Sequence, residues 1–558
     1  MAEEFSSIYV FHLRGNQRTS GERSRKEGGK IFGSGSRAPI AISLLVKNPK
    51  SKVKGEIFYH DIGDYLSRED KLRQIAQFGG IDGIRSAPGW TQIRPDAHHD
   101  WVNQRDPSFG KHMPLGEQDG AVGMFRNYSS GLKTNRDAWC YNFSETELRR
   151  NIGRAIRFYN SEVKRWADAT PKQREGGIAK FITIDATKFS WDYQQRIDVE
   201  KGRRYRENDQ GYRISTYRPF TRVHAYFERS LNNRVYQLPK MFPDRASENQ
   251  VICLQAPGGS KAFSAIVTDC IPDLHLIGDS QCFPLYVYAS VDGGDEEQEG
   301  EDTASGAQAP LNFGAGGKAT VSADANGRLT QDGKYRVLDA ITDEALERFK
   351  AAYSGEKVSK KDLFYYVYGL LHSEDYRRRY ANNLTKELPH IPAVKRFADF
   401  RAFTEAGIAL AKLHLGFDTA KPYSARIEFA KKRTSLADED YRVVKMRFGR
   451  PQGGVDDNES GEVQEKWDRT TIHYNETIAV HDIPLDAYDY IVNGKSAIEW
   501  VMERQSVTTD KTTGITNDAN AWAAEQRNAK YPLELLLRMI TVSLETMKIV
   551  RALPALKV

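Results

Sequence analysis

Apolar residues recur along this chain with two different periods, and the period changes several times between strand-like and helix-like. Near the N-terminus, β-branched and aromatic runs over Ile8–Leu13 and Pro39–Val46 predict strands, and GEIFYHD predicts another. Apolar positions three and four residues apart predict helices that begin near Ser67 or cover residues 144–166, 362–372, 397–415 and 531–553. The predicted fold class is therefore α+β or mixed α/β.

A serine followed three residues later by an acid precedes three of these helices. The pairs are Ser67 with Asp70, Ser144 with Glu147, and Ser359 with Asp362. In such a capping box each side chain bonds the backbone N–H of the other residue, so the pairs predict helix starts. The last helix is apolar on almost every side, and we expect it to be buried against another element.

The middle of the chain reads as short strands followed by an insertion. Residues 180–290 contain FITIDA, HAYFER, NQVICLQA and FPLYVYA, which predict strands separated by turns. From Val291 to about Gly333, large apolar residues almost disappear among Gly, Ala, Asp and Glu. This composition predicts a loop or disordered insertion at a boundary between domains.

Charge is distributed unevenly along the 558 residues, which are enough for about three or four domains. The net charge is only +6, but residues 126–245 hold 25 Lys and Arg against 14 Asp and Glu. A basic middle with a modest total predicts a surface directed at a polyanion. The alternative is an ordinary solvated basic surface.

The cysteines and the N-terminal sequence indicate in which cellular compartment the protein resides. Cys140, Cys253, Cys270 and Cys282 lie far apart without a C-x-x-C pair, which argues against a disulfide framework and a cysteine zinc site. MAEEFSSIYV lacks the features of a signal peptide, and no apolar run reaches the ~18 residues that a membrane span needs. We expect a soluble cytoplasmic protein.

A basic loop separates the first two predicted strands. Seven Lys or Arg, interspersed with glycines, lie between Arg14 and Arg37, which favours contact with a polyanion or a nucleotide edge. Phe32-Gly33-Ser34-Gly35-Ser36 superficially resembles a turn that holds S-adenosylmethionine or a dinucleotide. Such turns need a following helix N-terminus, whereas PIAISLLV predicts a strand. We therefore interpret this segment as a flexible basic loop.

Three other short motifs are weak. Asn493–Ser496 ends like a nucleotide P-loop, but the first glycine would fall on Asp489, so Ser496 is predicted to cap a helix. His98–Asp100 is interpreted as a surface loop rather than a metal or base cluster. Asp106–Phe109 differs by one residue from the Asn/Asp-Pro-Pro-aromatic motif of amino-methyltransferases and lacks the second, rigid proline. No nucleophile with its base is recognisable.

The segment Tyr217-Arg218-Pro219-Phe220 lies inside the basic middle. Proline stiffens a turn that displays an aromatic ring beside a guanidinium group, a pairing suited to stacking and to reading a guanine edge or a phosphate. Packing of Tyr217 and Phe220 in the core is an equally good interpretation.

Several long blocks of the chain resemble the C-terminal part of the single-chain Type ISP restriction-modification enzymes. The blocks are LRGNQRTSGERSRKEGGKIFGSGSRAPIAISLLVKNP, IRPDAHHDWVNQRDPSF, GLKTNRDAWCYNF, STYRPF, FPLYVY, YYVYGLLHSEDYRRRYANNLTKELPHIP, NGKSAIEWVMER and LLLRMITVSLETMKIVRALP. They cover nearly the whole chain apart from the acidic insertion.

This resemblance implies the end of an N6-adenine methyltransferase domain followed by a target-recognition domain that reads double-stranded DNA. The expected fold is the final strands of a Rossmann-like methyltransferase sheet and a mixed recognition domain with a helical spacer. The expected boundaries are 1–60 for the methyltransferase remnant, 61–290 and 421–558 for target recognition, 291–333 for the insertion and 334–420 for the spacer.

The resemblance also assigns roles to side chains. In related adenine methyltransferases a phenylalanine before the final hairpin strand stacks on the flipped adenine, and Phe32 occupies that position; the alternative is packing of Phe32 into the sheet. The other predicted DNA contacts are Arg14, Arg18, Arg23, Arg25, Lys26, Arg37, Arg94, Arg105, Lys133, Arg136, Tyr217, Arg218 and Arg222.

The resemblance implies sequence-specific DNA binding without catalysis by this chain alone. The nuclease, the translocase, the cofactor turn and the Asn-Pro-Pro-aromatic motif of the family are expected in upstream parts, supplied in cis or in trans. We predict no catalytic, cofactor-binding or metal residue here, and S-adenosylmethionine, ATP and Mg for the parent enzyme. The alternatives are a scaffold module that binds RNA or an acidic protein and, more weakly, an enzyme with its own S-adenosylmethionine pocket.

Overall fold

The computed structural model of the chain divides into two compact units. It describes residues 2–19, 21–33, 35–85, 89–117, 120, 122–259, 261–291, 327–430, 437–450 and 467–558, without the side chains of 21–23. Unit 1 comprises Met1–Lys111, Pro257–Phe263 and Arg378–Glu387, and unit 2 comprises His112–Ala256, Ser264–Arg377 and Leu388–Val558. The boundary expected at residue 60 thus falls inside unit 1, and most of the insertion lies outside the described residues.

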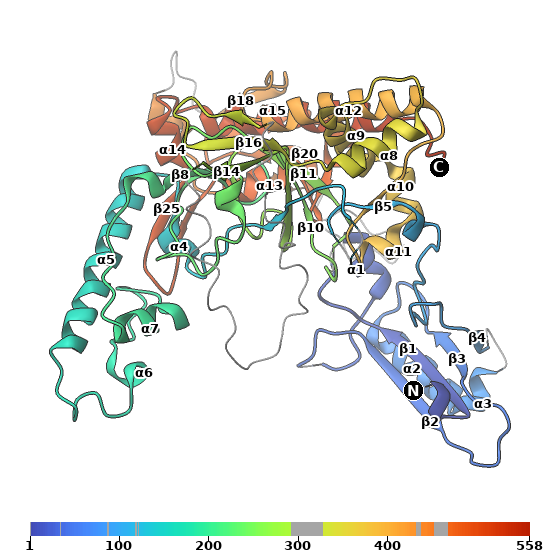
Figure 1. The fold of residues 1–558 in the computed structure, drawn as a ribbon. Helices are drawn as coiled ribbons and strands as arrows, with labels where there is room; N and C mark the ends of the chain where they lie inside the picture. The colour runs from blue at the N-terminus through green and yellow to red at the C-terminus, as the bar shows by residue number, and fades with distance from the viewer. Residues whose placement is uncertain are drawn as a thin grey trace. The chain divides into compact units, whose positions relative to one another are not determined.

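Unit 1 contains a four-stranded sheet in the order β2-β1-β3-β4 (Figure 1). β1 pairs antiparallel with β2 and parallel with β3, and β3 pairs antiparallel with β4. The elements of this unit are β1 (Ser7–Arg14), α1 (Gly21–Glu27), β2 (Ile40–Val46), β3 (Glu56–Asp61), α2 (Arg68–Phe78), α3 (Ile81–Ile84), β4 (Thr91–Ile93) and α11 (Ala381–Leu384). The three N-terminal strands expected from the sequence are present.

A small apolar core supports this sheet. Phe11 and Leu13 of β1 pack with Ile31, Ile62 and Ile84, and all five are buried. The helix expected near Ser67 is α2, whose capping box with Asp70 is formed in both directions. Phe11 and Leu13 are two residues apart on β1, so their side chains point to the same face of the sheet, and this face meets the core.

Unit 2 consists of several small sheets rather than one large one. The four-stranded sheets have the orders β11-β10-β13-β6, β12-β8-β9-β7 and β18-β21-β20-β19, and β14-β16-β15 has three strands. The strands are β5 (Met113–Pro114), β6 (Ser129–Ser130), β7 (Tyr141–Asn142), β8 (Tyr212–Thr216), β9 (Arg222–Tyr226), β10 (Val251–Gln255), β11 (Ala265–Thr268), β12 (Ile271–Pro272), β13 (Ser280–Pro284), β14 (Tyr286–Ser290), β15 (Arg328–Leu329), β16 (Tyr335–Asp339), β17 (His390–Ile391), β18 (Arg426–Phe429), β19 (Arg447–Gly449), β20 (Asp468–His473), β21 (Ile478–His481), β22 (Ile491–Val492), β23 (Lys495–Ser496), β24 (Val507–Thr509) and β25 (Thr516–Asp518). The mixed α/β class is confirmed.

The helices of unit 2 are α4 (Asp137–Cys140), α5 (Glu145–Ala167), α6 (Ile178–Phe181), α7 (Tyr193–Glu200), α8 (Asp343–Ala352), α9 (Lys360–His372), α12 (Phe397–Leu415), α13 (Ala497–Arg504), α14 (Ala519–Glu525) and α15 (Tyr531–Arg551), while α10 (Glu374–Arg379) contains residues of both units. The four longest, α5, α9, α12 and α15, lie at the positions that the apolar periodicity predicted, and α13 follows its predicted cap. The shorter helices α4, α6, α7, α8, α10 and α14 were not predicted. Ser359 forms its predicted capping box with Asp362, and Ser496, which was predicted as a cap, also forms a box with Glu499.

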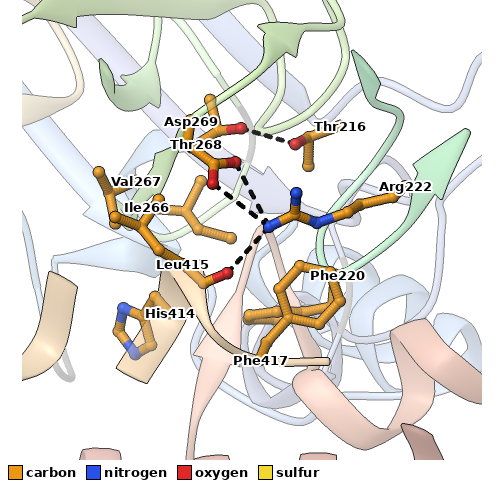
Figure 2. Close-up of a pocket in the computed structure, with 10 residues that line it drawn as sticks. All are labelled: Thr216, Phe220, Arg222, Ile266, Val267, Thr268, Asp269, His414, Leu415 and Phe417. Atoms are coloured by element: carbon orange, nitrogen blue, oxygen red, sulfur yellow. Dashed lines mark hydrogen bonds and ion pairs between the residues drawn. The ribbon is translucent and has the colours of Figure 1, made fainter. Parts of the chain in front are cut away.

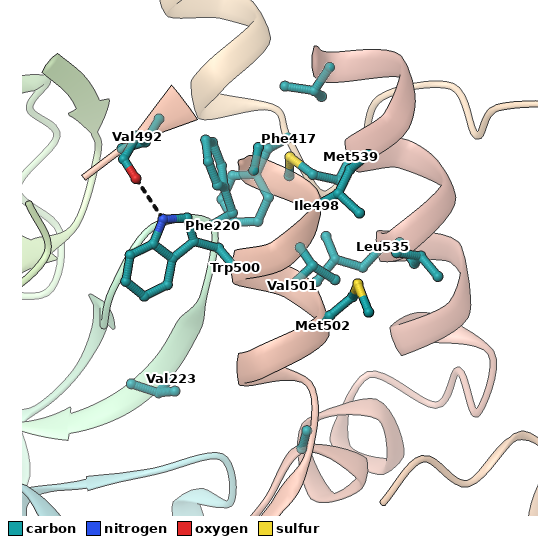
Figure 3. Packing of buried hydrophobic residues seen from close by; sticks show 14 of the residues in the cluster. Phe220, Val223, Phe417, Val492, Ile498, Trp500, Val501, Met502, Leu535 and Met539 are labelled. Carbon is teal, nitrogen blue, oxygen red and sulfur yellow. Dashed lines mark hydrogen bonds between the residues drawn. The ribbon is translucent and has the colours of Figure 1, made fainter. Parts of the chain in front are cut away.

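The main core of unit 2 lies where α13 and α15 meet (Figure 3). Ile498 of α13 and Leu535 and Met539 of α15 are fully buried there. The indole N–H of Trp500 donates to the carbonyl of Val492 at 2.8 Å, so this large side chain is buried without an unpaired donor. The burial expected for the last helix is confirmed.

Helix α5 forms a second core together with α6 and α7, and here two predictions were wrong. The Ser144 hydroxyl accepts the Glu147 N–H at 3.3 Å, but the Ser144 N–H donates to Asn142, so the capping box is half formed. The predicted strand FITIDA does not exist. Its Thr183 N–H bonds the Glu162 carboxylate at 2.8 Å instead of a neighbouring strand.

The described helices give no sign of membrane insertion, because none is both long enough and apolar enough to cross a bilayer.

Candidate nucleic-acid interface

The loop between β1 and β2 is folded, which corrects the expectation of a flexible loop. It contains helix α1, and the buried Lys71 ammonium donates to the carbonyls of Glu27 and Gly29 at 2.7 and 2.8 Å. A Cβ on Gly29 would lie 2.4 Å from the backbone nitrogen of Arg68, so glycine allows the two segments to approach closely. The loop is therefore held against α2.

Phe32 lies in this loop with 56% of its surface exposed. Within this chain the ring is therefore not packed into the sheet, which was the alternative to stacking. An exposed phenylalanine on an anchored loop loses little entropy when it contacts a flat partner. Its geometry permits stacking.

The predicted basic contacts of unit 1 separate into two groups. Arg18, Arg25, Lys26, Arg37 and Arg94 are exposed. The side chain of Arg23 lies outside the described residues. Arg14 and Arg105 instead pair with carboxylates inside unit 1.

Arg14 bonds Asp61 at 2.6 Å and also pairs with Asp64. Burial opposes the charged carboxylate, but the hydrogen bond from Arg14 lowers the pKa of Asp61. Arg105 pairs with Asp100 at 3.1 Å and with Glu387 at 3.7 Å. Both guanidinium groups fix loops, and neither is available to a phosphate without breaking these pairs.

The segments His98–Asp100 and Asp106–Phe109, which are weak motifs in the sequence, make contacts that stabilise their own loops. His98 and His99 are exposed on a loop, and the Asp100 carboxylate faces Arg105 and Lys386. Asp106 accepts hydrogen bonds from the N–H and hydroxyl of Ser108. No cluster of three His, Cys, Asp or Glu suited to a metal ion occurs among the described residues.

In unit 2, Arg136 is buried, so its predicted role in DNA contact is corrected. Its guanidinium donates to Asp192 at 2.9 Å, to Gln195 at 2.7 Å and to the carbonyls of Ser190 and Leu231. All three nitrogens of this guanidinium donate to groups inside the protein. Arg136 therefore anchors the loop that precedes α4.

Lys133, three residues earlier, lies on the rim of a pocket whose opposite wall includes His275. Arg218 approaches the same place from the turn after β8 and pairs with Asp137 at 3.5 Å and with Asp273. These charged side chains come from three separate segments. Only the tertiary structure brings them together.

The Tyr217–Phe220 turn is divided between core and surface. Phe220 is 1% exposed and packs against Phe417 and Tyr490, as the core interpretation predicted. The Tyr217 hydroxyl donates to Asp137 at 3.1 Å, and the Arg218 guanidinium lies 4.2 Å from the Tyr217 ring centre. The turn is therefore stabilised by the Tyr217–Arg218 contact and by Asp137 of α4.

Arg222 is also held by protein groups (Figure 2). It donates to the carbonyl of Leu415 at 2.9 Å and pairs with Asp269 and Asp418 at 3.3 and 3.4 Å. The adjoining cavity has a volume of about 10 Å³, which is room for about one water molecule. Arg222 therefore connects β9 to the end of α12. Its predicted role as a DNA contact is corrected, because its guanidinium is held by protein groups.

Comparison with known proteins settles the family. The family model of the Type ISP C-terminal specificity domain matches residues 123–535. The chain belongs to this Type ISP specificity-domain family. None of the curated proteins compared with the chain matches it.

Three solved structures resemble the Type ISP chain over nearly all its length. A nuclease-deletion mutant of the Type ISP restriction-modification enzyme LlaGI with a DNA substrate mimic is 35% identical, with a TM-score of 0.76. The ATP-dependent Type ISP restriction-modification enzyme LlaBIII bound to DNA is 30% identical, with a TM-score of 0.78. A DrdV–DNA complex is 27% identical, with a TM-score of 0.74. The alignments cover 100% of this chain for LlaGI and LlaBIII and 99% for DrdV. They cover only 37% of the LlaGI chain, 31% of the LlaBIII chain and 48% of the DrdV chain. The chain therefore spans less than half of each relative.

The specificity-domain match covers the pocket loops of unit 2, and sequence reasoning missed two of their side chains. Asn135 lies inside the GLKTNRDAWCYNF block, and its φ of 55° marks it as special only in the structure. His275 has no sequence signal, because the residues around it are ordinary. Its place beside Lys133 is a property of the fold.

Proposed function

We propose that this chain recognises a target in double-stranded DNA for an adenine-specific Type ISP restriction-modification enzyme. Membership of the specificity-domain family carries the proposal, supported by relatives whose structures hold DNA. The exposed cations Arg18, Lys26, Arg37 and Arg94 provide phosphate contacts in unit 1. Phosphate contacts position the duplex, and base contacts provide the sequence specificity.

The sheet of unit 1 is proposed to be the end of a methyltransferase sheet. Strand β2 lies at the edge of the described sheet and exposes Ile42, Leu44 and Leu45 by 50%, 45% and 41%. These residues point to both faces, so we expect further strands to pair with the free edge and other parts of the methyltransferase to cover both faces. Phe32, in the loop that leads into β2, would then stack on the flipped adenine.

Methyl transfer and DNA translocation are proposed to need other parts of the enzyme. S-adenosylmethionine, ATP and Mg would be bound there, because the chain covers 31–48% of the length of its structural relatives. This chain alone would bind DNA without methylating or cleaving it. Saturable binding of S-adenosylmethionine by this chain in calorimetry would contradict that division of roles.

A salt titration of duplex binding tests the function. The logarithm of the association constant should fall linearly with the logarithm of the salt concentration. Lys26→Ala should make the slope shallower by about one, whereas Lys548→Ala, on the exposed face of α15, should leave it unchanged. An affinity that does not depend on salt would exclude this interface.

Competition then separates target recognition from a scaffold that binds RNA or an acidic protein. A target-bearing duplex should displace labelled DNA better than a random duplex of equal length. Equal displacement by both would favour the scaffold, because a scaffold reads no sequence.

A further inference from the structure

Two loops of unit 2 border an open pocket of about 290 Å³. One loop covers residues 132–136 before α4, whose first residue, Asp137, also lines the pocket, and the other loop covers residues 273–275 after β12. The Leu132 N–H donates to the carbonyl of Pro272 at 2.8 Å, and the Leu274 N–H donates to the carbonyl of Leu132 at 3.0 Å. The loops are thus fixed to each other through their backbones, so the pocket is preformed.

The first loop is held in an unusual conformation at Asn135. Its φ of 55° is uncommon for a residue other than glycine, although asparagine tolerates it best. On either side the chain is anchored, because the Thr134 hydroxyl bonds Asp137 and the Arg136 guanidinium is buried. Backbone strain of this kind persists where the surrounding structure imposes it, often at binding sites.

The charges around the pocket nearly cancel. The cationic side chains are Lys133, Arg218 and His275, and the carboxylates are Asp137, Asp273 and Asp279. His275 lies 3.3 Å from Asp279, and that hydrogen bond raises the pKa of the imidazole towards the charged form. A phosphate site needs an excess of positive charge, so the balance favours a neutral, polar partner.

The side chains of Asn135 and Leu274 at the rim of the pocket can contact the edge of a base pair. The Asn135 amide is exposed and makes no hydrogen bond to any other described residue, so it offers both a donor and an acceptor. An asparagine amide can bond N6 and N7 of adenine together, and an apolar side chain can contact the thymine methyl group. Leu274, half-buried in the facing loop, provides that apolar surface.

We propose that this pocket reads an A·T base pair of the target, with Asn135 as its specificity-determining residue. The proposal rests on the DNA-recognition function proposed above and adds the site and the base pair. Arg136 acts as a positioning residue because it holds the loop from behind. Lys133 adds affinity at the rim through a nearby phosphate.

Selection from a randomised duplex library, with sequencing of the bound DNA, tests the site. Asn135→Gly removes the amide and tolerates the positive φ, and Asn135→Asp removes the donor but keeps the shape. Each variant of the 558-residue chain should lose at least about tenfold of the preference for A·T at one position, from the ~1–3 kcal/mol that a bidentate contact provides.

Asn493→Gly is the matched control, because Asn493 also has a positive φ, 48°, and lies in unit 2. It should select the wild-type site. Selection of that same site, with equal preference, by both Asn135 variants would overturn the proposal. If the wild-type chain binds DNA but enriches no site, target recognition itself is wrong, and the pocket proposal is rejected with it.

Discussion

Neighbouring basic residues of the same segment have opposite environments. Arg136 is 5% exposed and makes four hydrogen bonds within the protein, whereas Lys133, three residues away, lies at a pocket rim. Charge alone gave both residues the same predicted role. Burial decides which role each residue has. A buried guanidinium group needs protein partners, whereas an ammonium group at a pocket rim stays hydrated and can bind a ligand.

Arg136→Ala should lower the free energy of unfolding by about 3 kcal/mol or more, because Asp192 and Gln195 would lose their buried partner. Arg150→Ala, at an exposed arginine paired with Glu147, should cost less than about 1 kcal/mol. Urea unfolding measures both. Equal, small losses would show that Arg136 is not a structural anchor.

Phe32→Ala in a reconstituted methyltransferase should reduce methylation much more than DNA binding. The ring would restore part of the stacking that a flipped adenine loses, which is worth about 1–3 kcal/mol per base. Methylation rates and duplex affinities of the same variant provide the comparison. A parallel loss of both, or of neither, would contradict the stacking role.

At the scale of elements, α9 and α12 approach each other through glycines. A Cβ on Gly369 would lie 2.1 Å from the carbonyl oxygen of Phe403, and a Cβ on Gly407 would lie 1.9 Å from that of Tyr365. Both obstacles are backbone atoms, so they cannot move aside as a side chain could. These two residues therefore set the distance between the helices.

Gly369→Ala should destabilise unit 2 by about 3 kcal/mol or more, despite alanine's higher helix propensity, because the helices must separate. Ile408→Ala, at a 43% exposed position of α12, should cost less than about 1 kcal/mol. Thermal unfolding of the two variants distinguishes them. A stabilised Gly369→Ala chain would show that the helices can shift freely.

At the scale of the whole molecule, a buried polar network joins three helices of unit 2. The Tyr368 hydroxyl of α9 lies 2.6 Å from Nδ1 of His414 on α12, whose Nε2 lies 2.9 Å from the Thr546 hydroxyl on α15. Burial, reinforced by the charge of Arg377, lowers the pKa of His414 to about 3. The imidazole is therefore neutral in the folded protein at ordinary pH.

Stability should fall as the pH is lowered from 6.5 to about 4.5. The unfolded chain binds a proton at His414 below its ordinary pKa of 6.5, and the folded chain does not, so acid favours unfolding. The free energy of unfolding should fall by up to about 1.4 kcal/mol per pH unit for one such histidine. His372, whose pKa burial also lowers, adds to it in the same direction.

Urea unfolding across this pH range measures the effect, and His414→Gln should make the dependence shallower. His98→Gln, on an exposed loop, should leave it unchanged. Carboxylates whose pKa is lowered lose their stabilising contribution from about pH 5 downwards. The difference between the wild-type and His414→Gln chains therefore isolates the effect of His414. A stability that is constant between these pH values would show that the network admits protons while folded.

Much of the fold followed from local pattern. Helix α12 has the predicted bounds, and serine caps begin α2, α9 and α13. The failures arose where a distant partner replaced the local one, as when Glu162 bound the backbone of the predicted strand FITIDA. Of the candidate site, the sequence predicted Phe32 and Lys133 but not Asn135 or His275.

The sequence by itself determined the family, the mixed fold class and the start of each long helix, because capping and periodicity act over a few residues. Tertiary structure alone decided which arginines are anchors, since burial and pairing depend on residues far apart in the chain. It also folded the loop that carries Phe32 and joined the Lys133 and His275 loops around one pocket. Chemistry at a site depends on such convergence, which no local pattern encodes.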